Sequence, residues 1–304
     1  MRAKDQTIDA ATWWRLIVLS ILWGGSFFFA GLALRELPPL VIVCARVVLG
    51  ALMLVPVLLW SGLSLPRCLR GWAPFAMMGL LNNVLPMSLI VYGQTTISSG
   101  LASVLNATTP LFTVLVLAMS GDEPLSRRRL AGVVCGAAGV AVLQAPALLG
   151  GDAAPGVLLC LGAALSYGLS GLWAKRRMTG VPPLVAANGQ LLASSIVMLA
   201  FACIVEQPWT LPMPSPATWL ALLGLGSLST AIGYILFFQI IERSGPSNVM
   251  LVTLLVPITA ILLGRSVLGE GVTPHQIAGA AIIATALAII DGRLVERISH
   301  IRIR

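Results

Sequence analysis

Arg46 is the residue of this sequence best placed to do chemistry, because it is a cation inside the apolar stretch LVIVCARVVLGALM (residues 40–53). It lies seven residues after Pro39, which puts it about 10 Å along a helix that begins there. An arginine at mid-helix in a membrane costs about 2.5–3.5 kcal/mol on insertion scales. We expect Arg46 to offer a fixed positive charge to a substrate carboxylate. Snorkelling to the surface, or bonding to free backbone carbonyls, are the alternatives.

Uncharged polar and aromatic side chains fall at similar depth in other apolar segments. Asn82 and Asn83 lie in the middle of the third such segment, and Gln190 lies in the seventh. Trp23 and Tyr167 lie in the first and the sixth. Buried polar groups in lipid need partners or a wet cavity, so we predict that these five residues contact the substrate. The alternatives are interhelical hydrogen bonding for the amides and plain packing for the aromatic rings.

Pro110 and Pro257 interrupt two further apolar segments. Each proline leaves the carbonyl four residues earlier without its helical donor, and these carbonyls belong to Asn106 and Thr253. We predict a hinge at each proline and a substrate contact at Asn106. The alternative is a structural kink in which neighbouring Ser and Thr hydroxyls bond the carbonyls.

The groups that enzymes, metal sites and proton exchangers use are missing at mid-depth. Glu206 and Asp291 fall at the ends of apolar segments, while His275 and His300 fall outside them. The five cysteines are odd in number and do not follow a metal-ligand spacing, so we interpret them as packing residues. We therefore predict no cofactor, no metal and no enzymatic activity. For a protein that moves a solute across a membrane, this absence would favour facilitated transport over carboxylate-coupled proton exchange.

The elements that must position these residues are membrane helices. The chain has 304 residues, of which 58% are hydrophobic and 10% charged, and its mean hydropathy is +0.95. A soluble domain carries about 25% charged residues. Charge-free runs such as residues 71–121 are long enough for two passes of about 20 residues each. Backbone groups in lipid must bond internally and no alternating strand pattern is present, so the predicted fold class is an all-α polytopic membrane protein.

Gly, Pro and charged residues divide the apolar sequence into segments, and these segments predict ten transmembrane helices. Their expected spans are residues 14–34, 39–60, 72–92, 100–119, 129–148, 155–174, 182–205, 216–240, 246–266 and 274–290. With the N-terminus in the cytoplasm, all but three of the 19 Lys and Arg residues fall in cytoplasmic segments; the exceptions are Arg35, Arg46 and Arg265. This bias predicts that both termini are cytoplasmic. The net charge of +8 then faces anionic membrane lipid, and no nucleic-acid partner is expected.

An internal repeat divides the chain into two halves, which we assign to residues 14–148 and 155–291, with cytoplasmic tails at 1–13 and 292–304. At an offset of 144, Trp23, Gly24, Ser26, Pro38, Pro39 and Leu40 match Tyr167, Gly168, Ser170, Pro182, Pro183 and Leu184. At an offset of 147, Trp72, Gly79, Pro110, Glu123, Ala131, Gly132 and Ala141 match Trp219, Gly226, Pro257, Glu270, Ala278, Gly279 and Ala288. The basic clusters do not recur. Five helices per half is an odd number, so the second repeat must be inverted, as in many secondary transporters.

Four motifs carry a resemblance to a known family: ILWGGSFFFA, CARVVLGALML, ATTPLFTVLVL followed by DEPLSRRRLAG, and LLVPITAILLG followed by LGEGVTPHQIAG. Over roughly residues 13–291, the sequence resembles the EamA-type branch of the drug/metabolite transporter superfamily. The resemblance implies a ten-helix permease, usually a bacterial inner-membrane exporter of amino acids or related metabolites. Residues 120–124, SGDEP, depart from the Leu-Gly-Glu more frequent in the family.

Other functions and partners remain as alternatives. Within transporters, the rivals are multidrug efflux and sugar-nucleotide exchange, although a sugar-nucleotide carrier should line its cavity with several basic residues. A membrane interaction protein without transport activity is a further alternative. Gly132 and Gly136 form a GxxxG motif, and Ala280, Ala284 and Ala288 repeat every four residues. Both patterns permit close helix packing, for which the uses are internal packing or a homodimer.

Overall fold

The computed structural model describes residues 9–148, 153–244 and 251–291, and these residues form helices and connecting turns without any strand. The first half contains α1 (Ala10–Ala33), α2 (Pro39–Trp60), η1 (Leu69–Trp72), α3 (Ala73–Gly79), η2 (Leu80–Val84), α4 (Leu85–Gly93), α5 (Ser99–Asn106), α6 (Thr109–Met119) and α7 (Arg127–Leu148). The second half contains α8 (Ala154–Arg177), α9 (Pro183–Phe201), η3 (Ala202–Glu206), η4 (Pro208–Thr210), α10 (Pro216–Leu223), η5 (Gly224–Ile232), α11 (Gly233–Ser244), α13 (Leu251–Leu263), η6 (Gly264–Leu268) and α14 (Pro274–Asp291).

Most of these helices are long and apolar enough to cross a bilayer. Seven segments meet both conditions, namely Ala10–Ala33, Pro39–Trp60, Leu69–Gly93, Ser99–Met119, Ala154–Arg177, Pro183–Glu206 and Pro216–Ile240. Two shorter apolar helices, Val252–Leu268 and Pro274–Ile290, and the 22-residue α7 follow the same alternation along the chain. The predicted fold class, an all-α membrane protein of two inverted five-helix repeats, is confirmed.

Proline and small polar residues set where the helices begin. Pro39, Pro183 and Pro216 occupy the first positions of α2, α9 and α10, where the missing N–H is no loss. Ser98 and Ser215 cap α5 and α10 by accepting a hydrogen bond from the backbone N–H three residues later. The sequence therefore contains strong local signals for the helix starts.

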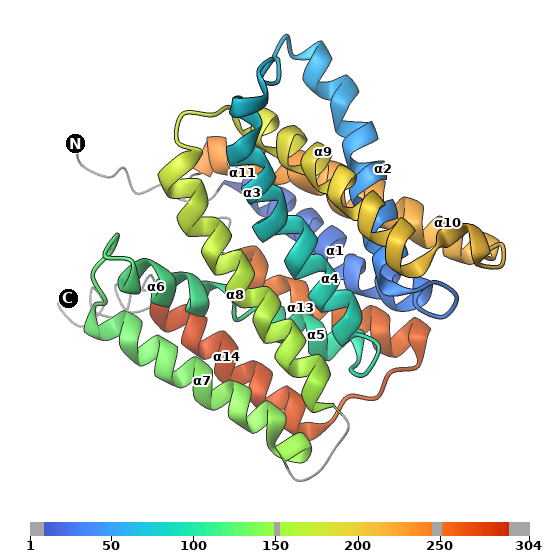
Figure 1. Ribbon diagram of the computed structural model, residues 1–304. Coiled ribbons are helices and arrows are strands. Elements are labelled where there is room, and N and C mark those ends of the chain that lie inside the picture. The colour runs from blue at the N-terminus through green and yellow to red at the C-terminus, as the bar shows by residue number, and fades with distance from the viewer. Residues whose placement is uncertain (1–8, 149–152, 245–250, 292–304) are drawn as a thin grey trace.

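The helices of the two halves interleave. In Figure 1, α1 packs against α13, α4 against α8, α2 against α9, and α7 against α14. The contacts also come in repeat-related pairs: α2 packs on η5, and its counterpart α9 packs on η2. The largest contacts thus join one half to the other, so the core of the protein is an interface between repeats.

The α7–α14 pair uses the small-residue motifs internally. A Cβ added at Gly132 would lie 2.4 Å from Ile290 Cγ1, and one at Gly139 would lie 2.8 Å from Ile283 Cγ1. At Gly136 the nearest atom is Leu111 Cδ1, at 2.2 Å. The internal-packing alternative for the GxxxG motif is confirmed. Figure 1 shows α7 in green and α14 in red lying side by side along one edge of the molecule.

Two of the expected helices are interrupted within their spans. The fourth membrane span, Ser99–Met119, contains a two-residue turn at Ala107 and Thr108, so α5 ends at Asn106 and α6 begins at Thr109, just before Pro110. The third helix contains the π-helical segment η2 between α3 and α4. The start of the ninth helix, most of both tails and His300 lie outside the described residues, as does the side chain of Asp291.

Candidate functional site

The π-helical segment η2 turns two consecutive asparagines towards the second half of the protein. Asn82 Nδ2 donates to Gln190 Oε1 at 3.0 Å and to the Tyr234 hydroxyl at 3.1 Å. Asn83 Nδ2 donates to Ser194 Oγ at 3.0 Å. A regular α-helix separates neighbouring side chains by about 100°, whereas π-bulges rearrange side chains and are frequent at functional sites. From this segment both amides reach the Tyr234 hydroxyl.

The Tyr234 hydroxyl connects this network. It accepts from Asn82 Nδ2 and donates to Asn83 Oδ1 at 3.1 Å, while its ring stacks on Phe238 with centroids 6.0 Å apart. Ser170 Oγ donates to the side-chain oxygen of Asn82, Oδ1, at 3.2 Å. The two asparagines come from the first half and their partners from the second, so the hydrogen bonds cross the repeat interface.

Arg46 lies beside this network and has only neutral partners. Its Nε donates to Thr230 Oγ1 at 3.1 Å, and Thr230 donates in turn to the carbonyl of Leu225 at 2.8 Å. Tyr167 and Tyr234 are the ionisable groups that interact electrostatically with the guanidinium. Among the described residues, neither Nη1 nor Nη2 has a hydrogen bond or an ion pair. Arg46 thus keeps two donor groups available in a partly buried position.

The site has an approximate internal symmetry. Gln190 is the repeat counterpart of Arg46 at an offset of 144, and Thr230 is the counterpart of Asn83 at 147. Arg46 donates to Thr230, whereas Gln190 accepts from Asn82, the neighbour of the Thr230 counterpart, so the two hydrogen bonds are similar in place but not equivalent. η5, which carries Thr230, is π-helical over the positions that correspond to η2. Duplication therefore built both sides of the site, and the guanidinium on one side breaks the symmetry.

The aromatic residues expected at the site take different places. Tyr167 lies near Arg46 and Tyr234. Trp23 packs on Phe237, with ring centroids 5.5 Å apart, and a Cβ added at Gly233 would lie 2.7 Å from Trp23 Nε1. Gly233 thus gives the indole room beside the residue that precedes Tyr234.

Asn106 and the prolines lie at the broken fourth helix. Pro110 is the second residue of α6, and Thr109 Oγ1 donates to the carbonyl of Asn106 at 2.7 Å. The carbonyl that the proline leaves is therefore bonded by a neighbouring hydroxyl, as the structural alternative proposes. Asn106 Oδ1 is buried and has no hydrogen-bond partner in the described part of the chain. Pro257, in contrast, lies inside the unbroken helix α13.

Three carboxylates cap helix N-termini of the opposite half. Glu206 accepts from the N–H groups of Leu40 and Val41, at 3.1 and 2.8 Å. Glu270 accepts from those of Ser99 and Gly100, at 2.9 and 3.3 Å, and Glu36 accepts from Ser215 N at 2.7 Å. Because helix N-termini favour negative charge, these contacts hold the halves together. We call this the carboxylate-capped end.

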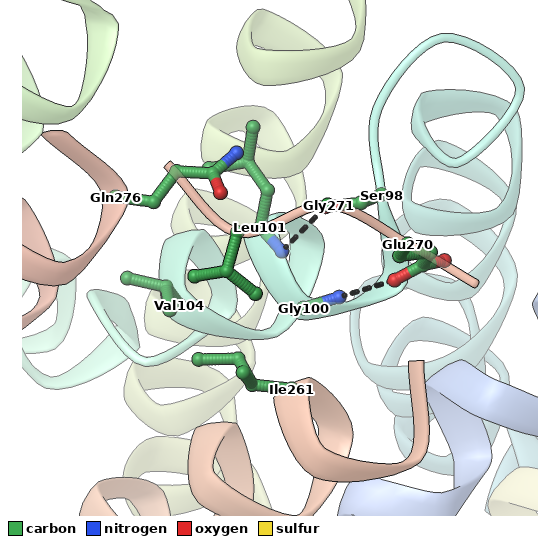
Figure 2. A pocket seen from close by; sticks show the side chains of 9 residues that line it. Ser98, Gly100, Leu101, Val104, Ile261, Glu270, Gly271 and Gln276 are labelled. Carbon is green, nitrogen blue, oxygen red and sulfur yellow. Dashed lines mark hydrogen bonds between the residues drawn. The ribbon is translucent and has the colours of Figure 1, made fainter. Parts of the chain in front are cut away.

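Figure 2 shows the cap on α5, where the Glu270 carboxylate points at the N–H of Gly100 beside a small cavity lined by Leu101 and Ile261. The cavity holds about 10 Å³, roughly the room of one water molecule. The two hydrogen bonds from Ser215 hold the pKa of the exposed Glu36 below its usual value. The carboxylate-capped end is therefore closed around the start of α5.

Ion pairs join the halves at the opposite end, which we call the basic end. Glu123 pairs with Arg129 at 2.7 Å and with Lys175 at 3.0 Å, and Arg176 Nε donates to Asp122 at 3.0 Å. Arg176 lowers the pKa of Asp122, and Lys175 lowers that of Glu123, because each donates a hydrogen bond to the carboxylate. Glu123 is the repeat counterpart of Glu270, so equivalent glutamates serve opposite ends.

The structure thus brings Arg46, Asn82, Asn83, Gln190 and Tyr167 together, whereas Trp23 lies to one side and Asn106 at the helix break. Sequence reasoning missed Tyr234, Thr230 and Ser194. The repeat offset could have found Thr230, because it maps there from Asn83. Tyr234 had no such signal, since its counterpart is Met87.

Comparison with known proteins agrees with this architecture. The uncharacterized transporter YoaV of Bacillus subtilis (strain 168) is 26% identical over 274 residues, covering 90% of this chain and 94% of its own. The probable amino-acid metabolite efflux pump of Salmonella typhimurium is 28% identical over 292 residues, covering 90% and 92%. The uncharacterized inner membrane transporter YedA of Escherichia coli (strain K12) is 25% identical over 278 residues, covering 90% and 89%.

A solved crystal structure shares the fold, with a TM-score of 0.66 at 21% identity over 95% of this chain and 98% of that one. The EamA-like transporter family matches twice, at residues 13–144 and again at residues 154–291. These two matches cover both five-helix repeats, and the chain belongs to the EamA-like transporter family of the drug/metabolite transporter superfamily.

Proposed function

We propose that this transporter is a bacterial inner-membrane permease that exports amino acids or related small metabolites by alternating access. The observation that carries the proposal is Arg46, whose Nη1 and Nη2 groups have no partner among the described residues and whose Nε has a neutral one. A guanidinium matches a carboxylate, which can accept two parallel hydrogen bonds from it. The name of the Salmonella relative, an amino-acid metabolite efflux pump, supports the same substrate class.

The other polar residues complete a site for a zwitterion. Asn82, Asn83 and Gln190 can exchange their mutual hydrogen bonds for bonds to substrate, with Trp23 and Tyr167 as walls. Asn106 Oδ1, at the helix break outside this cluster, is an acceptor without a donor among the described residues, and it would serve as a separate contact for a substrate ammonium group. Because the hydrogen bonds of the network cross between repeats, a substrate that replaces them changes the balance between open states.

The distribution of charged residues supports a membrane orientation and a mode of energy coupling. The excess of Lys and Arg at the basic end favours a cytoplasmic location for that end and for both termini. The printed name of YedA, an inner membrane transporter, supports the same membrane. The polar residues identified at the site carry no carboxylate, which supports facilitated transport rather than exchange of protons at a buried acid.

Transport by the purified protein in liposomes tests the proposal. We expect saturable movement of amino acids without an imposed pH gradient. Arg46→Gln should raise KM about tenfold or more, because a charge-assisted hydrogen bond contributes about 1.5–3 kcal/mol. Arg265→Gln removes the same charge from an exposed position outside the site, and this control should transport normally.

Four other outcomes would each contradict part of the proposal. An unchanged KM for Arg46→Gln would show that the guanidinium does not hold the substrate. A strict need for the pH gradient would contradict facilitated transport. Movement of amphipathic drugs or nucleotide sugars in place of amino acids would favour the rival transporter classes, and the lack of any saturable movement would favour a membrane protein that does not transport.

A further inference from the structure

A hollow of about 660 Å³ opens at the basic end, away from the Arg46 site. It lies where four membrane helices end or begin, between the α2–α3 connection and the α8–α9 connection (Figure 1). Trp72 Nε1 donates to the carbonyl of Pro66 and Trp173 Nε1 to that of Pro74, each at 3.0 Å. These bonds fix the α2–α3 connection against α8, so the walls are formed before any ligand binds.

Two arginines line this hollow, and its lining contains no acidic residue. Arg67 has no hydrogen bond or ion pair to any described residue. Arg177 lies over the Trp173 ring with its Cζ 5.8 Å from the centroid. The nearby acids do not neutralise them, because Asp122 and Glu123 are bonded to Arg176, Lys175 and Arg129. The hollow thus has a local excess of positive charge.

Apolar side chains extend from the same segment. Trp60, at the end of α2, and Leu69, two residues after Arg67, are each 90% exposed. Side chains of this kind at the end of a membrane helix lie in the interfacial and hydrocarbon layers. A ligand in this hollow would therefore place a charged group beside the two arginines and an apolar group beside Trp60 and Leu69.

We propose that this hollow binds the phosphate of an anionic phospholipid, with Arg67 and Arg177 as donors to the phosphate oxygens. Ser64, which also lines the hollow, supplies a hydroxyl for the headgroup. The acyl chains then follow the apolar surface near Trp60 and Leu69. Basic pockets at the ends of membrane helices suit phosphate-bearing headgroups in general, and guanidinium groups bind phosphate through paired hydrogen bonds. The inference does not depend on which solute is transported.

The test is a titration of the purified full-length protein in neutral detergent with phosphatidylglycerol or phosphatidylcholine, read as the shift in thermal midpoint. We expect phosphatidylglycerol to stabilise the protein and phosphatidylcholine to have little effect. Arg67→Gln with Arg177→Gln should weaken phosphatidylglycerol binding about 30-fold, while the corresponding lysine variants should retain most of it. Arg127→Gln with Arg128→Gln removes two exposed charges outside the hollow and is the matched control.

Two further arms distinguish the source of the phosphate. Inorganic phosphate and glycerol phosphate should give no shift at the concentrations at which the lipid acts. An equal shift with either would show a soluble ligand and overturn the assignment to lipid. Equal binding of phosphatidylglycerol by the Arg67/Arg177 variant and the control, or no preference over phosphatidylcholine, would overturn the site itself.

Discussion

Arg46 is unfavourable in a membrane helix unless its surroundings compensate the guanidinium. Insertion of such a residue costs about 2.5–3.5 kcal/mol, and the bond to Thr230 satisfies only one of its donor groups. The nearby tyrosines and amides are polar but neutral, so they solvate the cation without neutralising it. Under the proposed function, release of a substrate anion would leave Arg46 solvated but without a neutralising charge, and this state would favour binding of another anion.

Tyr234 is the residue on which the cross-repeat network most depends. Tyr234→Phe removes the hydroxyl that both asparagines use and leaves a buried amide oxygen and a donor without this partner. We expect a loss of about 1–2 kcal/mol in the free energy of unfolding, measured as a lower thermal midpoint in detergent. The control Tyr92→Phe removes a hydroxyl that donates to Glu206 at the exposed surface, and should cost much less. Equal midpoints for the two variants would contradict the role of Tyr234.

At the scale of elements, the sequence predicts where helices lie better than how they are interrupted. The predicted span 39–60 agrees with α2, because Pro39 and the end of the apolar run mark its limits. The sequence does not predict the π-helical turns η2 and η5, since the periodicity of a uniformly apolar segment does not distinguish an α-helix from a π-helix. Asn82 and Asn83 could be selected as polar residues at depth, but their joint contact with Tyr234 depends on η2 and on tertiary packing.

The cap on α5 gives a prediction about one element. A Cβ added at Gly264 would lie within 3.1 Å of the Glu270 carboxylate carbon and closer still to its oxygen Oε2, so Gly264→Ala should displace Glu270 from Ser99 and Gly100. Glu270→Ala removes the same cap, which should cost about 0.5–2 kcal/mol of stability. We expect faster hydrogen exchange in α5 for both variants.

Because the two substitutions remove one interaction, their effects should not add in the double variant. Gly271→Ala is the matched control, since an added Cβ there meets nothing within 4 Å. Additive costs, or an effect of Gly271→Ala as large as that of Gly264→Ala, would mean that Gly264 acts in some other way.

At the scale of the whole molecule, the sequence is sufficient to predict the inverted repeat, but not to predict how the two repeats differ in helix continuity. Unequal distribution of basic residues between equivalent segments required the second half to be inverted, and the helix pairing between halves agrees with this. The same repeat gave no reason for a break at one proline and not at the other. Pro110 and Pro257 occupy equivalent positions, yet the helix is interrupted before Pro110 and continuous through Pro257.

This asymmetry predicts how the transporter changes state. In inverted-repeat transporters, alternating access moves one repeat against the other around a fixed site. We infer that the two repeats exchange shapes in this movement, so the helix α13 should break before Pro257 when the break before Pro110 closes. Pro257→Ala restores a backbone donor inside α13 and should disfavour that break. We expect slower solute counterflow in liposomes with little change in substrate binding, measured by thermal shift. Pro110→Ala is the matched variant at the already broken helix and should instead lower the thermal midpoint of the present state. If Pro257→Ala left counterflow unchanged, or reduced binding as much as transport, the two prolines would be kinks of the fold and not alternating hinges.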